Sequence, residues 1–145
     1  MRVTKTFSFD MAHALFGHDG PCKNIHGHTY HLSVTLLGEI IQEPLNPKDG
    51  MVIDFSDFKQ IIQAEIISKF DHSLTLNKNT PHALIEGLNE NFDKINYVPF
   101  QPSCENLLIE FQQTIVQKLP PNLSLHNIKL QETPTSYAAW FAEDN

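Results

Sequence analysis

The chain has 145 residues and a net charge of −7, and Arg2 is its only arginine. Nucleic-acid binders and proteins of anionic membrane surfaces use clustered Lys and Arg, so this composition argues against both kinds of partner. No apolar run approaches the roughly 20 residues that span a bilayer, and the first residues lack the pattern of a signal peptide, so we expect one cytoplasmic domain that binds a small molecule.

The first two predicted strands carry the clearest pattern. The odd positions Val3, Phe7, Phe9 and Met11 are apolar with polar residues between most of them, and His13 continues that inward face. A second strand begins near His26, and its even positions place His26 and His28 on the apolar face. The connection over residues 14–25 is long, and long loops in compact domains are often functional.

Two helices and two further strands complete the predicted fold. Residues 77–101 are polar and predict an irregular stretch with one short strand at 97–100. The order ββααββ predicts an α+β fold, with a four-stranded antiparallel sheet and two helices on one face. The remaining predicted elements are a helix from the N-cap Ser56 to about Phe70, a helix from Ser103 to the Pro120–Pro121 pair, and strands near 126–132 and 137–141.

Three histidines face the inner side of the predicted hairpin. His26 and His28 point to one side of a strand, two residue rises apart, and His13 lies on the neighbouring strand. Three imidazoles with an open fourth position are the arrangement of a catalytic zinc site. The alternative is a set of hydrogen-bonded core histidines, but three in phase on paired strands favour a metal. We therefore predict Zn²⁺ bound by His13, His26 and His28.

Three other groups could transfer protons or bind a ligand near such a metal. Cys22 lies four residues before His26, and a dication with nearby imidazoles favours a thiolate. The adjacent Asp71 and His72 can form an oriented acid–base pair. Glu132, on an otherwise apolar strand face, could accept two hydrogen bonds from an aminopyrimidinone edge. Each group also has a simpler interpretation. Cys22 would be a loop cysteine without a function, Asp71 and His72 an ordinary surface pair, and Glu132 a residue at the end of its strand in contact with water.

Together these residues resemble the 6-pyruvoyltetrahydropterin synthase and 6-carboxytetrahydropterin synthase family over nearly the whole chain. The most specific element is the Cys-x3-His-Gly-His motif with its upstream histidine. The resemblance implies the tunnelling fold, with residues 1–145 as a single pterin-synthase-like domain. It also implies trimers or hexamers whose sheets close into barrels and whose subunits share active sites. The matching segments are FDMAH at 9–13, CKNIHGH at 22–28, GMVIDF at 50–55, DHSL at 71–74, PSCEN at 102–106 and ETPTS at 132–136.

The resemblance also implies roles for individual residues, which fall into zinc ligands, catalytic groups and groups that bind the pterin. Cys22 matches the general base, Asp71 and His72 match its relay partners, and Glu132 matches the carboxylate that anchors the pterin ring. Cys104 lies at a predicted helix start, where the dipole could also favour a thiolate, but nothing else in the sequence points to it. The zinc ligands are His13, His26 and His28, and the other residues of the pterin pocket are Ser103, Cys104 and Glu105.

The family chemistry is that of a lyase acting on 7,8-dihydroneopterin triphosphate. One branch eliminates triphosphate to give 6-pyruvoyltetrahydropterin. The other also releases acetaldehyde and gives 6-carboxy-5,6,7,8-tetrahydropterin, an early intermediate towards queuosine. The three-residue gap between Cys22 and His26 and the ETPTS ending resemble the second, bacterial branch, which we therefore predict.

Three alternatives stay open at this point: the pyruvoyl synthase, a non-catalytic pterin- or metal-binding relative, and a GTP cyclohydrolase or dihydroneopterin aldolase of related fold. The chain also departs from the family in two places. Residues 79–101 exceed the length found in compact members, and Cys104 replaces a small hydroxyl residue or alanine. We expect both departures to reshape the rim of the pocket.

Overall fold

A long antiparallel hairpin forms the centre of the fold in the computed structural model, which describes residues 1–144. It consists of β1 (Arg2–Ala14) and β2 (His26–Gly38), with His13 directly opposite His26. Both strands lie where the period-two pattern predicts them. The side chains at alternate positions of β2 are fully buried, which confirms the predicted inward face: Tyr30, Leu32, Val34 and Leu36.

The sheet has six strands among the described residues, in the order β4-β3-β1-β2-β5-β6. On one side of the hairpin, β5 (Leu123–Thr133) and β6 (Ser136–Phe141) add antiparallel strands, as predicted. On the other side, β3 (Ser73–Asn77) and β4 (Ile95–Val98) add two parallel strands next to β1. The prediction of four antiparallel strands is therefore wrong, because parallel strands need no tight turn that would mark them in the sequence.

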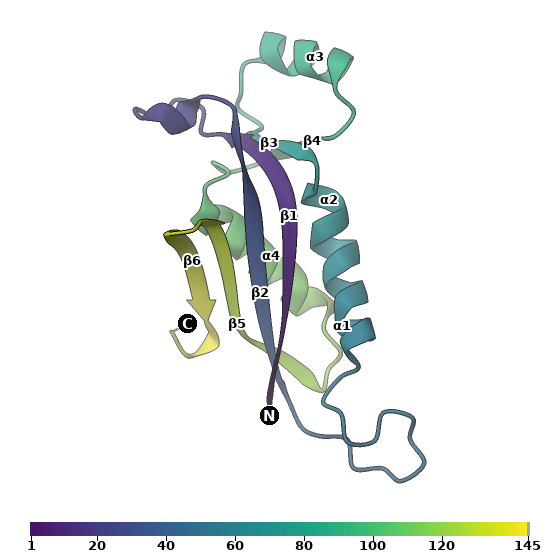
Figure 1. The fold of residues 1–145 in the computed structure, drawn as a ribbon. Helices are drawn as coiled ribbons and strands as arrows, with labels where there is room; N and C mark the ends of the chain where they lie inside the picture. The colour runs from purple at the N-terminus through teal and green to yellow at the C-terminus, as the bar shows by residue number, and fades with distance from the viewer. Residues whose placement is uncertain (145) are drawn as a thin grey trace.

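Helices cover one face of this sheet (Figure 1). A first helical segment comprises α1 (Phe55–Ile62), a π-helical turn η2 (Gln63–Ile67) and α2 (Ser68–Phe70), and α4 (Cys104–Lys118) lies beside it. Ser103 caps α4, as predicted. The cap of α1 is Asp54 rather than the predicted Ser56, because the Asp54 carboxylate accepts the Ser56 N–H at 2.6 Å.

A third helix, α3 (His82–Asn91), lies beyond β3 and β4 at the end of the molecule. It buries no residue, although Leu84, Ile85 and Leu88 stand at helical spacing. The predicted irregular stretch at 77–101 is thus wrong for α3, and the short strand predicted at 97–100 is β4 at Ile95–Val98. Within residues 1–144, no helix is long and apolar enough to cross a bilayer.

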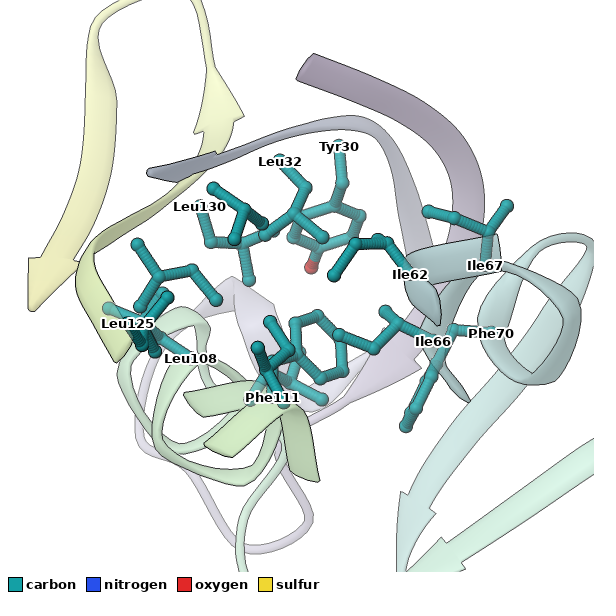
Figure 2. Packing of buried hydrophobic residues seen from close by; sticks show 14 of the residues in the cluster. Tyr30, Leu32, Ile62, Ile66, Ile67, Phe70, Leu108, Phe111, Leu125 and Leu130 are labelled. Carbon is teal, nitrogen blue, oxygen red and sulfur yellow. The ribbon is translucent and has the colours of Figure 1, made fainter. Parts of the chain in front are cut away.

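The core lies between the sheet and the helices, around Phe111 of α4 (Figure 2). The ring of Phe111 meets Phe9 at a centroid distance of 6.2 Å and Phe70 at 4.9 Å, and Phe9 stacks on Tyr30 at 5.4 Å. Burying such a side chain contributes about 1.5–3 kcal/mol. The apolar packing gives way to polar groups at the Tyr30 hydroxyl and His13, which are 3.5 Å apart. The candidate site therefore begins where the core ends.

Candidate active site

The three histidines of the hairpin converge at this end of the core. One nitrogen from each of His13, His26 and His28 lies within 4.8 Å of the other two. The ring centroids are 4.5 Å apart for His13 and His26 and 5.1 Å apart for His26 and His28. Nitrogen ligands of a tetrahedral Zn²⁺ are about 3.3 Å apart, given metal–nitrogen distances of about 2.0–2.1 Å. Small side-chain rotations would therefore bring all three nitrogens onto one ion.

Backbone carbonyl groups orient two of these imidazoles. His13 Nδ1 is 2.7 Å from the Pro102 carbonyl oxygen, and His26 Nδ1 is 2.8 Å from that of Asn24. A carbonyl only accepts, so each Nδ1 carries the hydrogen and each Nε2 keeps its lone pair for a metal. His28 Nε2 is buried without a hydrogen-bond partner among the described residues, and burial lowers the pKa of His13. Two imidazoles oriented by carbonyl groups and an orphaned buried nitrogen fit Zn²⁺.

Glu132 reaches the histidine cluster from β5. Its Oε1 lies 3.5 Å from His13 Nε2 and 3.8 Å from His28 Nε2, and its side chain is 23% exposed. The structure thus places Glu132 at the edge of the cluster rather than at a solvated strand end. A ligand that binds this carboxylate would lie next to the metal position.

Tyr30 supports Glu132, and the sequence analysis missed this role. The Tyr30 hydroxyl donates to Glu132 Oε1 at 3.0 Å. Burial, followed by the Glu132 charge, raises the pKa of Tyr30, so the phenol stays protonated and continues to donate. The sequence does carry a signal for this role. Tyr30 lies on the inward face of a predicted strand, where a phenol hydroxyl needs a hydrogen-bond partner.

Cys22 lies in η1 (Pro21–Lys23), in the connection that leads into β2. Its carbonyl oxygen accepts the Leu15 N–H at 2.9 Å, which extends the hairpin pairing. The thiol is partly buried and makes no hydrogen bond within residues 1–144. Cys22 is close enough to Tyr30 to contribute to its raised pKa, of which burial is the largest cause. The backbone of Cys22 therefore lies next to Leu15, two residues after His13 of the cluster.

Asp71 and His72 form a pair that lies next to Asp10 of β1. The Asp71 carboxylate accepts the Asp10 N–H at 3.0 Å and lies 3.0 Å from His72 Nδ1. The Asp10 N–H, followed by His72 and Lys94, holds the pKa of Asp71 below its ordinary value. The pair contacts Asp10, whereas Cys22 contacts Leu15. Asp10 and Leu15 are five residues apart, about 17 Å of extended chain at about 3.3 Å per residue, so the pair and the Cys22 backbone contact different parts of the chain.

The first turn of α4 borders the histidine cluster through the Pro102 carbonyl. The Ser103 hydroxyl accepts the Asn106 N–H at 3.4 Å, and Glu105 is exposed. The Cys104 thiol is buried and donates to the Leu130 carbonyl at 3.3 Å. Burial raises the pKa of Cys104 to about 11. Burial therefore disfavours a thiolate at Cys104, although this residue begins α4.

Two cavities meet at His28. One, of about 440 Å³, lies between His28 and Glu132. The other, of about 800 Å³, lies between the sheet and α3, and its lining includes His28, His72 and Lys94. Both volumes are of the size that small-molecule ligands occupy. The cavities thus connect the histidine cluster to Glu132 on one side and to His72 on the other.

The fold and this group of residues define a small α+β protein with a candidate metal-dependent active site. A model of the 6-pyruvoyl tetrahydropterin synthase family matches residues 2–143. The chain belongs to this family, and it is an enzyme of the tetrahydropterin synthase type, a lyase.

Curated relatives extend the match over nearly the full length. The chain is 38% identical over 146 residues to the 6-carboxy-5,6,7,8-tetrahydropterin synthase of Haemophilus influenzae, covering 96% of this chain and 97% of the relative. It is 32% identical to the enzyme of the same name from Rickettsia felis, covering 94% and 97%. The 6-pyruvoyl tetrahydropterin synthase of Caenorhabditis elegans has the same fold, with a TM-score of 0.66, 22% identity and coverage of 98% and 95%.

Proposed function

We propose that the protein converts 7,8-dihydroneopterin triphosphate to 6-carboxy-5,6,7,8-tetrahydropterin, releasing acetaldehyde and triphosphate, as a step towards queuosine. The observation that carries the proposal is the convergence of His13, His26 and His28 beside the Glu132 carboxylate. It joins a metal site to a group that can bind an aminopyrimidinone edge. The names of the bacterial relatives support the carboxy product over the pyruvoyl product.

His13, His26 and His28 would hold one Zn²⁺, and Pro102 and Asn24 would keep two of these ligands in place through their carbonyl oxygens. When bound, the ion supplies Lewis acidity, which acidifies the C–H and O–H bonds of a substrate side chain next to it. Groups of the protein next to the three histidines could then remove those protons at neutral pH.

Glu132 would anchor the pterin ring. Tyr30 binds its Oε1, and Oε2 accepts no hydrogen bond from residues 1–144. The carboxylate therefore keeps acceptor positions for the N–H groups of the ring. Because Glu132 borders the histidine cluster, a ring bound there would place its side chain over the metal position. Ser103, Cys104 and Glu105 would line this pocket.

Cys22 and the Asp71–His72 pair would transfer protons on two sides of the substrate. A thiolate at Cys22 can act as the general base beside the histidines, and His72, oriented by Asp71, can give or take a proton at Nε2 because its Nδ1 faces the carboxylate. They contact the chain at Asp10 and at Leu15, about 17 Å apart along an extended strand, which argues against a direct relay in one chain. We therefore propose that the complete site takes the pair from a neighbouring subunit.

Incubation with dihydroneopterin triphosphate tests the function directly. We expect the 6-carboxy product and acetaldehyde, both identified by mass spectrometry. A 6-pyruvoyl product without acetaldehyde would support the alternative enzyme, and absence of turnover would support a non-catalytic relative. Parallel incubations with GTP and dihydroneopterin separate the cyclohydrolase and aldolase alternatives.

Assembly into a trimer or hexamer follows from the same proposal. β6 is an edge strand, and such edges invite pairing with another chain. Light scattering should give the mass of three or six subunits. A fully active monomer would contradict both the assembly and the shared site.

Subunit mixing tests the shared site. We expect Cys22→Ala and His72→Ala proteins to be inactive alone but to regain activity after joint refolding. In a symmetric ring formed from an equal mixture, about a quarter of the sites combine an intact Cys22 from one subunit with an intact His72 from its neighbour. The matched control mixes Cys22→Ala with His28→Ala. These positions belong to the same hairpin region, so every mixed site keeps a lesion and no activity returns. Equal recovery in the two mixtures would contradict the proposal.

A further inference from the structure

The turn that carries Asp71 and His72 is held by β4, a strand to which the sequence analysis assigned no role. The Lys94 ammonium group donates to the Asp71 carbonyl oxygen. The Lys94 carbonyl oxygen accepts the Leu74 N–H at 3.1 Å, just after the pair. Asn96 donates to the Lys69 carbonyl at 3.1 Å and to the Ser73 hydroxyl at 3.0 Å. β4 and Lys94, the residue before it, therefore contact this turn before, at and after the Asp71–His72 pair.

His72 has a backbone conformation that needs such support. Its φ is +55°, in the left-handed region that side chains other than glycine rarely adopt. Its N–H donates to the Asp10 carbonyl at 2.7 Å, while the Asp10 N–H donates to the Asp71 carboxylate. Relaxation of His72 to an ordinary φ would break these contacts and turn the imidazole away from Asp71. Strained residues of this kind persist where their surroundings fix them, often at functional sites.

Lys94 is suited to fix the turn because its contact is charged and lies at the pair itself. It binds the carbonyl group of the peptide bond that joins Asp71 to His72, and its charge also helps to lower the pKa of Asp71. Lys94 and His72 line the same cavity of about 800 Å³. Both ends of the Lys94 residue, ammonium and carbonyl, are thus used to hold the segment from Asp71 to Leu74.

We propose that Lys94 is a positioning residue that holds the Asp71–His72 pair in its left-handed turn for proton transfer. The proposal rests on the proposed function of that pair. It gives the long 79–101 segment a purpose, because this segment brings β4 and Lys94 to the active site.

The test compares Lys94→Met, Lys94→Gln and Lys94→Arg with the control Lys78→Met. Lys78 lies just before the 79–101 segment, is exposed, and its ammonium group makes no hydrogen bond or ion pair within residues 1–144. In Lys94→Met we expect kcat to fall about tenfold, the lower end of the cost of losing an orienting partner at a metal site. KM and metal content should stay within about twofold of the parent, since the proposed pterin anchor is Glu132 and the metal ligands are the three histidines, whereas Lys94 donates to the Asp71 carbonyl. Lys94→Arg should recover most of kcat.

Hydrogen–deuterium exchange of the peptide that contains His72 gives a second readout, independent of turnover. Exchange of this peptide should accelerate in Lys94→Met and Lys94→Gln and stay at the parent rate in Lys94→Arg and Lys78→Met. Parent-like exchange and kcat in Lys94→Met would overturn the proposal, as would equal losses in all three Lys94 variants. If the parent enzyme does not act on the pterin, the proposed function fails, whereas the exchange measurement still decides whether Lys94 holds the turn.

Discussion

Replacing His28 by alanine should strip the metal from the purified protein and abolish turnover. The change removes one of three nitrogens that converge within 4.8 Å and leaves two ligands for the ion. Loss of an outer partner alone typically lowers metal affinity about tenfold to a hundredfold, so loss of a ligand should lower it further. Metal content measured by inorganic mass spectrometry should fall from about one zinc per chain to near zero, in parallel with the rate of product formation.

The matched control is His31→Ala on the same strand. His31 is exposed and points away from the cluster, so this variant should keep its metal. Circular dichroism of both variants separates loss of metal from loss of fold. Full zinc occupancy in a protein that carries both His26→Ala and His28→Ala would contradict the assignment.

The sequence predicts the histidine cluster well because its geometry depends on one hairpin. In β1 and β2 the side-chain period is two, so the alternation of apolar residues determines which face each histidine takes. The pairing of His13 with His26 then follows from the length of two adjacent strands. The position of Glu132 follows in the same way, because β5 pairs directly with β2.

The other half of the sheet depends on contacts that local patterns do not encode. β3 pairs with β1 across more than fifty residues of chain, in parallel, through only four residue pairs from Met11–Ser73 to Ala14–Leu76. The hydrogen bond from the Lys94 ammonium group to the Asp71 carbonyl also joins residues that are far apart in the sequence. The role of Tyr30 was missed for a different reason. Its ring follows the apolar pattern of β2, and only its hydroxyl group shows that the inward face of the strand becomes polar at this position.

Replacing Cys22 by alanine should separate catalysis from binding. The variant should keep zinc, because the three imidazoles and the carbonyl groups that orient them are unchanged. It should still bind the pterin through Glu132. Its kcat should fall by about a hundredfold to ten-thousandfold, the usual cost of losing an acid–base group. Steady-state kinetics with the triphosphate substrate, together with metal analysis, measures both effects.

Alkylation distinguishes the two cysteines of the same protein. Cys104 is the internal control, because it is buried, donates to Leu130 and has a pKa raised to about 11. Iodoacetamide should therefore modify Cys22 quickly and Cys104 slowly, as read by peptide mass spectrometry. Removing zinc should slow the reaction at Cys22, since a nearby dication stabilises a thiolate. Near-normal turnover in Cys22→Ala would defeat the role of this thiol as general base, and His72 would then be the remaining proposed group on this chain to remove the proton.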